Sequence, residues 1–346
     1  MYMTPLNETT IISYLNEKVL PHTRLKGSGV EKVGKAGGGL SSLVFRVELS
    51  NGDVIFLKQV VEGALGFTEV PKDILILFSE DRQQFEVKAI RVFREAVGAK
   101  FAPEVIWFSP EDKILVLSDI AGVDGFILED KFPEIITVEM SKQLGFIAAK
   151  LAKNTFGKAK PIRSDIIDRD IRKLKMKYLF EIAFDKLPGN RQQIEQRIKT
   201  FVPIATDITS SVVHGDYHPR NIIVAHNHVA VFDFEESIIW DPVFDIATLL
   251  GHYLLRLLHH QEMKDKIIDC IMVLLESFYG DFGIVNGLKE EFRIRNYAAG
   301  WMMFRIDGIS PAKWIIDEAE KQRIRDFVVK LLFGKHNLIS LIKVDL

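Results

Sequence analysis

Hydrophobic and polar positions separate sharply in the stretch that begins at Val212. An apolar run ends at His214 and another begins at Ile222, with polar and turn-forming residues between them. A third apolar run, 229–232, ends in an acidic segment. Short apolar runs bounded by turn residues are typical of buried strands. The pattern therefore predicts a polar loop held between two strands, followed by a third strand that ends at Asp233.

The first third of the chain alternates strand-like segments with tight turns. Asn51 and Gly52 are a strong hairpin signal, and the apolar strand that follows them contains Lys58. The predicted elements are a helix at 7–20 that Pro21 ends, strands on both sides of a glycine-rich turn at 34–39, a strand at 54–60, a helix at 81–97, and strands at 102–108 and 113–118.

The rest of the chain is predicted to be mainly helical, which makes the fold class α+β. The sequence Asp241-Pro242 suggests a helix start, because proline suits the first helical position. A mixed-charge run at 165–175 is typical of a solvated helix face. The predicted helices are 139–153, 163–184, 189–203, 243–258, 262–279, 288–305 and 313–332.

Composition narrows the classes of partner. The net charge of −2 over 346 residues gives no electrostatic footprint for nucleic acid or for an anionic membrane. No apolar run is long enough to span a bilayer, and the N-terminus lacks a secretory signal pattern. With Cys270 as the single cysteine, an intrachain disulfide is excluded. We expect a cytoplasmic protein, as a monomer or homodimer.

Three polar residues near the predicted strand ends suit phosphoryl transfer. Asp216 lies in the polar loop, Asn221 follows it by five positions, and Asp233 lies twelve positions beyond Asn221. One carboxylate can accept the proton of an attacking hydroxyl, while an asparagine and a second aspartate supply the hard oxygen ligands that Mg²⁺ prefers. We therefore expect Asp216 to be the base, with Asn221 and Asp233 as metal ligands.

The same residues carry a resemblance to a known family. The spacing His214-Gly215-Asp216-x-His218-x-x-Asn221, with Asp233-Phe234-Glu235 downstream, resembles the aminoglycoside phosphotransferase and choline kinase family over about residues 30 to 260. The resemblance implies a two-lobed protein-kinase-like fold and transfer of the γ-phosphoryl group of ATP, with Mg²⁺, to a hydroxyl of a small molecule. The lobes would be a nucleotide-binding lobe at 1–118, a hinge at 119–122 and a helical lobe at 123–346.

The resemblance also implies roles for further residues. Lys58 would contact the α- and β-phosphates and pair with Glu86 of the helix at 81–97, in preference to Glu95. His214 would hold the loop, and Asp245 would anchor the loop backbone. The phosphates of the nucleotide would contact the glycine-rich turn and the serines that follow it, which are Gly37, Gly38, Gly39, Ser41 and Ser42. The backbone of the hinge residues Asp119 and Ile120 would contact the adenine.

Several alternatives stay open. His214 and His218 have the spacing of a zinc pair on a helix, but Gly215 and Pro219 argue against a helix there. Glu235 could join a second Mg²⁺ or face solvent. The acceptor could be an aminoglycoside or amino sugar, methylthioribose, or choline. The rival from another class is a nucleotide-binding pseudokinase without catalysis, and a hydrolase has little support because no Gly-x-Ser-x-Gly elbow occurs.

Overall fold

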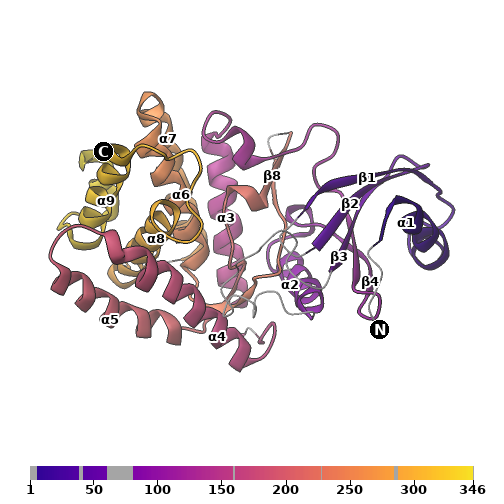
Figure 1. The fold of residues 1–346 in the computed structure, drawn as a ribbon, viewed down its shortest axis with the longest axis horizontal. Coiled ribbons are helices and arrows are strands. Elements are labelled where there is room, and N and C mark those ends of the chain that lie inside the picture. The colour runs from indigo at the N-terminus through magenta and orange to yellow at the C-terminus, as the bar shows by residue number, and fades with distance from the viewer. Residues whose placement is uncertain are drawn as a thin grey trace. The chain divides into compact units, whose positions relative to one another are not determined.

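The computed structural model describes residues 6–38, 42–60, 81–158, 160–226, 228–283 and 287–345 (Figure 1). The chain forms two compact units. The first consists of Met1–Phe126, Ile223–His226 and Ala230–Glu236, and the second of Ile127–Ile222, Asn227–Val229 and Ser237–Leu346. Asp233 and Glu235 therefore belong to the first unit, together with Lys58.

A five-stranded antiparallel sheet organises the first unit, with the order β1-β2-β3-β5-β4. Successive side chains of β3 point to opposite faces of this sheet, so the side chains of Leu57 and Lys58 lie on different faces. Figure 1 shows α1 and α2 on opposite sides of the sheet. The bounds are α1 Glu8–Tyr14, β1 Val30–Gly38, β2 Ser42–Leu49, β3 Val54–Val60, α2 Arg82–Ala96, β4 Val105–Ser109 and β5 Ile114–Ser118.

One face of this sheet packs an apolar core, and the other carries a charged cluster. On the face with Leu57, the segment from α1 to the turn at Leu20–His22 packs a continuous apolar core with Phe45 and Val116. Pro21 lies inside that last turn, so the helical segment continues to His22, two residues beyond its predicted end at 20. On the other face, α2 brings a buried glutamate next to Lys58, which positions the first cluster described below.

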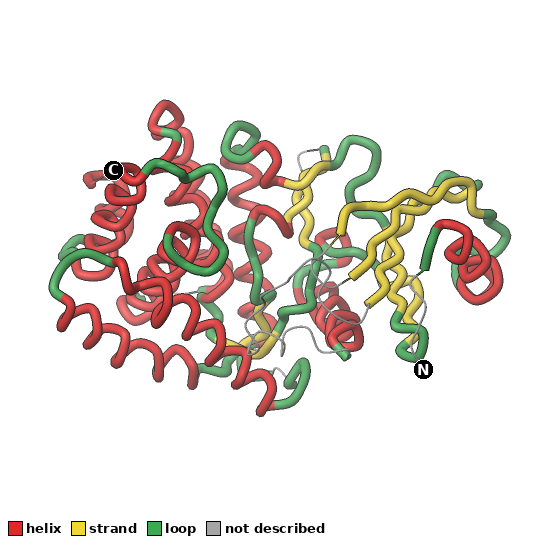
Figure 2. The backbone as a smooth tube through the Cα atoms, viewed as in Figure 1, coloured by secondary structure: helices red, strands yellow, loops and turns green. Residues whose placement is uncertain are grey.

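The second unit is built almost entirely of helices, as Figure 2 shows. Gly251 of α6 would place a Cβ 3.1 Å from the carbonyl oxygen of Ala298 in α8, so glycine allows these two helices to approach closely. The helices are α3 Val138–Thr155, α4 Asp165–Met176, α5 Arg191–Asp207, α6 Phe244–His259, α7 Lys264–Phe282, α8 Leu288–Ile306, α9 Glu318–Phe333 and α10 Leu338–Asp345.

Short strands hold the polar loop singled out in the sequence. Strand β7, Ser211–Val213, pairs with β10, Ile238–Trp240, and the loop follows β7 directly. A second small sheet has the order β6-β8-β9, with bounds Phe126–Ile127, Ile222–Ala225 and His228–Val231. None of the helices in the described ranges is long and apolar enough to cross a lipid bilayer.

Some predicted helix limits are wrong, and a local polar contact decides two of them. Helix α6 begins at Phe244, one residue after its predicted start at 243, since Asp241 caps a turn in which its Oδ1 accepts a hydrogen bond from the Val243 N–H at 3.2 Å. Helix α9 begins at Glu318 and not at 313, because Asp317 caps it through two backbone N–H groups. The segment predicted as one helix at 163–184 leaves α-helical geometry after Met176.

Candidate active site

The loop after β7 makes a tight polar turn that presents Asp216. Gly215 has a φ of +83°, a left-handed conformation that suits glycine, so the chain can reverse directly after His214. The backbone N–H of Asn221 then donates to the carbonyl of His218 at 2.9 Å, and residues Pro219–Asn221 form a short 3-10 turn that leads into β8. His214 and His218 do not lie on one helix, so they do not share a helical face as the zinc alternative requires.

Asp216 is held through one carboxylate oxygen. Its Oδ2 lies 3.1 Å from Nε2 of His218 and accepts a hydrogen bond from Nδ2 of Asn221 at 2.8 Å. Its backbone N–H donates to Nδ1 of His214 at 3.3 Å. No described residue donates a hydrogen bond to Oδ1, and the side chain is 24% exposed. The free oxygen is therefore available to accept a proton from a bound molecule.

Asp216 is kept ionised by its surroundings. Burial alone would raise the pKa of its carboxyl, but the imidazole of His218 and the ammonium of Lys175 hold that pKa below its ordinary value. The amide of Asn221 uses both its hydrogen bonds on Asp216, to the carbonyl at 3.0 Å and to the carboxylate. Its Oδ1 accepts no hydrogen bond from the described residues, so a hard oxygen remains that suits Mg²⁺.

Asp245 joins the first turn of α6 to the loop. Its two carboxylate oxygens accept hydrogen bonds from the N–H of His214 at 2.7 Å and of Gly215 at 3.0 Å. Both N–H groups belong to buried residues, so the carboxylate that accepts from them fixes the start of the loop. Burial raises the pKa of Asp245 to about 6, although the two N–H donors act in the opposite direction.

This raised pKa predicts a pH-dependent stability. The ordinary pKa of the carboxyl is 3.8, so between that value and about 6 the folded protein holds a proton that the unfolded chain has lost. The resulting stabilisation is complete below pH 3.8 and is lost as the pH rises through about 6. We expect wild type to lose about 1–2 kcal/mol relative to Asp245→Asn from about pH 5 to about pH 7.5, in urea unfolding. A difference that does not change with pH would contradict this.

The mixed-charge run of α4 is the solvated face that the sequence predicts only in part, since Asp165, Arg169 and Lys173 are exposed. Asp168, Arg172 and Lys175 are buried, because each has a backbone partner in the strands and loops beside α4. Nζ of Lys175 donates to the carbonyl of Gly215 at 3.0 Å, and Arg172 donates to the carbonyl of Ile239 at 2.8 Å. Sequence reasoning missed Lys175, although its place among apolar residues on one side of the helix was a usable signal.

Lys175→Met is expected to destabilise the protein by about 1–3 kcal/mol, since it leaves the buried Gly215 carbonyl without its donor. Lys173 lies on the exposed side of the same helix, so Lys173→Met is the matched control. Chemical unfolding of the two variants measures the difference. Equal stability of both variants would show that the contact with Gly215 contributes little.

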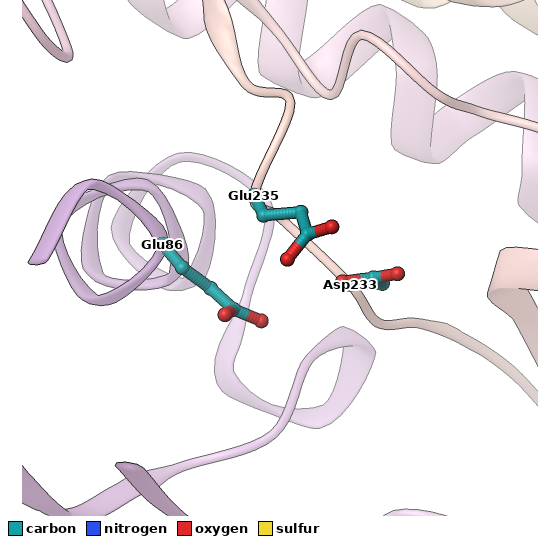
Figure 3. Close-up of side chains that lie close together, drawn as sticks. All are labelled: Glu86, Asp233 and Glu235. Carbon is teal, nitrogen blue, oxygen red and sulfur yellow. The ribbon is translucent and has the colours of Figure 1, made fainter. Parts of the chain in front are cut away.

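The second cluster lies within the first unit and centres on Lys58. Its Nζ lies 3.0 Å from Glu86, 2.9 Å from Asp233 and 3.1 Å from Glu235. Figure 3 shows Glu86 reaching in from α2, while the other two carboxylates come from the segment after β9. The predicted pairing of Lys58 with Glu86 is thus present. Burial alone would lower the pKa of Lys58, but the three carboxylates hold it well above its usual value.

Glu235 does not face solvent, so that alternative is wrong. Phe234 is buried against Phe93 of α2 with ring centroids 4.9 Å apart, which turns the residues on each side of it toward Lys58. Glu235 also lies 3.5 Å from the guanidinium of Arg82, a buried residue that sequence analysis did not single out. Burial raises the pKa of Glu235, and Lys58 opposes that rise.

The donor set of this cluster fits a divalent cation. One oxygen from each of Glu86, Asp233 and Glu235 lies within 4.8 Å of the others, and carboxylate oxygens are the ligands that Mg²⁺ prefers. Of the three, Asp233 is the most accessible, with 36% of its side chain exposed. Glu86 is fully engaged with Lys58, and burial raises the pKa of Glu86 to about 7. Asp233 is therefore the carboxylate best placed to give up its ion pair with Lys58 and coordinate a metal ion instead.

The remaining predicted nucleotide contacts also belong to the first unit. Gly37 and Gly38 close β1, while Gly39 and Ser41 lie outside the described residues. Ser42 begins β2, and its buried hydroxyl accepts a hydrogen bond from Arg82 at 3.3 Å. Asp119 and Ile120 follow β5, and the Asp119 carboxylate accepts a hydrogen bond from the N–H of Ala121 at 2.8 Å.

Comparison with known proteins connects this geometry to a family. The profile described as "Phosphotransferase enzyme family" matches residues 33–260, about two thirds of the chain. No curated protein sequence matches. Among solved structures, a choline/ethanolamine kinase family protein from Mesorhizobium loti is 16% identical, with a TM-score of 0.53 and coverage of 95% of this chain and 97% of its own.

Two further structures have the same fold. The GDP complex of aminoglycoside 2'-phosphotransferase-IIIa is 15% identical, with a TM-score of 0.50 and 98% coverage of each chain. A macrolide 2'-phosphotransferase from Brachybacterium faecium is 12% identical, with a TM-score of 0.50 and coverage of 96% of this chain and 100% of its own. These likenesses confirm the predicted α+β, protein-kinase-like fold.

Proposed function

Because the chain belongs to the phosphotransferase enzyme family, we propose that it transfers the γ-phosphoryl group of ATP to a hydroxyl of a small molecule. The observation that carries the proposal is the state of Asp216. Its carboxylate is held ionised, one oxygen is fixed by His218 and Asn221, and Oδ1 has no donor among the described residues. A base in this state needs only an acceptor hydroxyl within hydrogen-bonding distance.

In the proposed reaction, Oδ1 of Asp216 accepts the hydroxyl proton while the acceptor oxygen bonds to the γ-phosphorus and ADP leaves. The transition state is loose, so the base mainly orients the hydroxyl and takes the proton late. Asn221 and Asp233 would hold Mg²⁺, which offsets the negative charge of the phosphates when bound. Lys58 would add its charge at the phosphates, with Glu86 keeping its side chain in place.

The nucleotide contacts are proposed for the first unit. The glycine-rich turn would cover the phosphates with backbone N–H groups, and the backbone of Asp119 and Ile120 would contact the adenine. The GDP complex of the structurally similar aminoglycoside 2'-phosphotransferase supports nucleotide use by this fold. A preference for ATP over GTP is part of the proposal and is tested by exchanging the nucleotide.

The test is release of ADP from MgATP in the presence of a panel of hydroxyl compounds: aminoglycosides, methylthioribose, simple sugars, choline and homoserine. We expect release with at least one acceptor, and none once EDTA removes Mg²⁺. Mg-dependent nucleotide binding with no ADP release for any acceptor would favour the pseudokinase. Failure to bind MgATP at all would reject the proposal.

A further inference from the structure

Arg305 of α8 is a buried cation whose guanidinium contacts the neutral oxygens of Ser310. Only 8% of the residue is exposed, and its guanidinium donates to the carbonyl and hydroxyl oxygens of Ser310 at 2.6 and 2.8 Å. Across the described ranges, no carboxylate forms an ion pair with it. A buried charge is costly unless it is paired, so proteins seldom leave one in this state without a purpose. A ligand that brings negative charge would satisfy Arg305.

The charged groups that act on Arg305 include two further arginines and Asp216. After burial, the charge of Arg220 is the strongest influence that lowers the pKa of Arg305, to about 10, and Arg256 acts in the same direction. Asp216 and Glu129 oppose them. Arg256 already pairs with Glu129 at 2.9 Å, and Glu134 also acts on it. Arg220 is exposed on the turn that follows Asp216 and forms no ion pair within the described part of the chain.

Two unsatisfied hydrogen-bonding groups lie next to these arginines. The ring of His252 is 5.3 Å from that of His218, which contacts Asp216, and 6.2 Å from that of Trp301. Nε2 of His252 and Nε1 of Trp301 are buried without hydrogen-bond partners, and Trp301 is only 7% exposed. Burial and the nearby cations hold the pKa of His252 well below its ordinary value, so its ring is neutral. The indole N–H can only donate, which suits an electronegative ligand atom.

The features that would bind a cationic acceptor are already used within the protein. Near the C-terminus, Asp317 caps α9, Glu318 pairs with Arg325 and Glu320 pairs with His259 at 2.6 Å. No acidic pocket is therefore left in that segment of the described chain.

The tryptophans do not form a cage for a quaternary amine. The guanidinium of Arg256 lies 4.0 Å from the centroid of the Trp314 ring, so a cation already covers that face. Trp240 is fully buried, stacked on Phe244 with ring centroids 3.9 Å apart. Choline and aminoglycosides are thus poorly matched to the surroundings of Asp216.

We infer that the acceptor is an anionic alcohol whose carboxylate or phosphate group binds Arg305 and Arg220 beside Asp216. This inference rests on the proposed phosphotransfer and names the class of its acceptor. A second anion next to the Asp216 carboxylate and the nucleotide phosphates would be repelled without local cations. Arg305 can bind such a group through two parallel hydrogen bonds, which fixes its orientation and places the hydroxyl at the base.

The first experiment compares acceptors in matched sets by ADP release from MgATP. Glycerol is set against glycerate and glycerol 3-phosphate, and glucose against gluconate and glucose 6-phosphate, with choline and kanamycin as cations. We expect release with an acidic member and at least tenfold less with its neutral counterpart. The carboxylate and phosphate arms separate the two kinds of anion. Release with neutral or cationic acceptors only would overturn the inference while leaving the proposed function intact.

The second experiment asks whether Arg305 and Arg220 hold the anion. Arg305→Gln and Arg220→Gln are expected to raise KM for the acidic acceptor about 10- to 100-fold, with kcat and KM for MgATP changed far less. Arg323→Gln, at an exposed position of α9, is the control and should behave as wild type. A fall in kcat with every acceptor and an unchanged acceptor KM would place Arg305 on the transferred phosphoryl group and overturn the inference.

A third measurement separates this inference from the proposed function. Malonate and inorganic phosphate are used as anion probes, and Tm is compared with chloride at equal ionic strength and without nucleotide. We expect a larger stabilisation of wild type and Arg323→Gln than of Arg305→Gln and Arg220→Gln. If no acceptor gives ADP release but this difference in Tm persists, the anion site is supported and the proposed phosphotransferase activity is not. Equal shifts in all four proteins would overturn the anion site.

Discussion

Asp216→Asn is expected to lower kcat about a thousandfold while leaving MgATP binding nearly unchanged. General-base assistance contributes on the order of 10²–10⁴ to a rate, and asparagine cannot accept the hydroxyl proton. The substitution preserves the shape of the side chain, and the amide oxygen can still accept the hydrogen bond from Asn221 that Oδ2 now accepts. The loop should therefore keep its geometry, so the loss would report on chemistry. Single-turnover ADP formation and nucleotide-dependent Tm measure the two effects.

The control for this variant is Asp326→Asn, an exposed aspartate of α9. This control removes an aspartate carboxylate more than 100 positions from Asp216 in the sequence, and we expect the kcat of the variant to equal that of wild type. If Asp216→Asn retained more than about a tenth of wild-type turnover, Asp216 would not be the base. If it lost nucleotide binding as well, a folding defect would explain the result, and unfolding measurements would show it.

The residues of the site that could be predicted from the sequence are those that lie close together along the chain. Asp216 and Asn221 are five positions apart, and the polar run between two apolar runs predicts that both lie in one loop and therefore close together. The strands around them and most helices of the second unit follow from periodicity, because core-facing positions recur at fixed intervals. Lys58 was recognisable for a similar reason, since a charge inside an apolar strand requires a partner.

What sequence could not supply depends on partners distant in the chain. The charged residues of α4 look like a solvent-facing set until the carbonyls of Gly215 and Ile239 are known to lie beside them. Glu235 was ambiguous because its direction is set by the packing of Phe234 on Phe93. Arg305 could not be singled out from the sequence, because only the structure shows that no carboxylate of the described residues forms an ion pair with it.

The Lys58 cluster leads to the second large effect, expected for Lys58→Met. Removal of one preorganised cation at the phosphates is expected to lower kcat about 10²–10³-fold and to raise KM for MgATP. Methionine keeps much of the buried length of the side chain, so strand β3 should retain its packing. Lys32→Met, on exposed β1 of the same sheet, is the matched control and should leave both constants unchanged.

The same substitution has a second consequence that does not require turnover. Without the ammonium, Glu86, Asp233 and Glu235 face one another within 4.8 Å and repel, so the pKa of Glu86, already raised to about 7, rises further. Mg²⁺ then no longer competes with Lys58 for Asp233, and we expect the variant to gain more stability from Mg²⁺ than wild type does, in thermal unfolding without nucleotide. A variant that loses turnover but shows no such gain would mean that Mg²⁺ does not bind at these carboxylates, and the metal would have to be held by other residues.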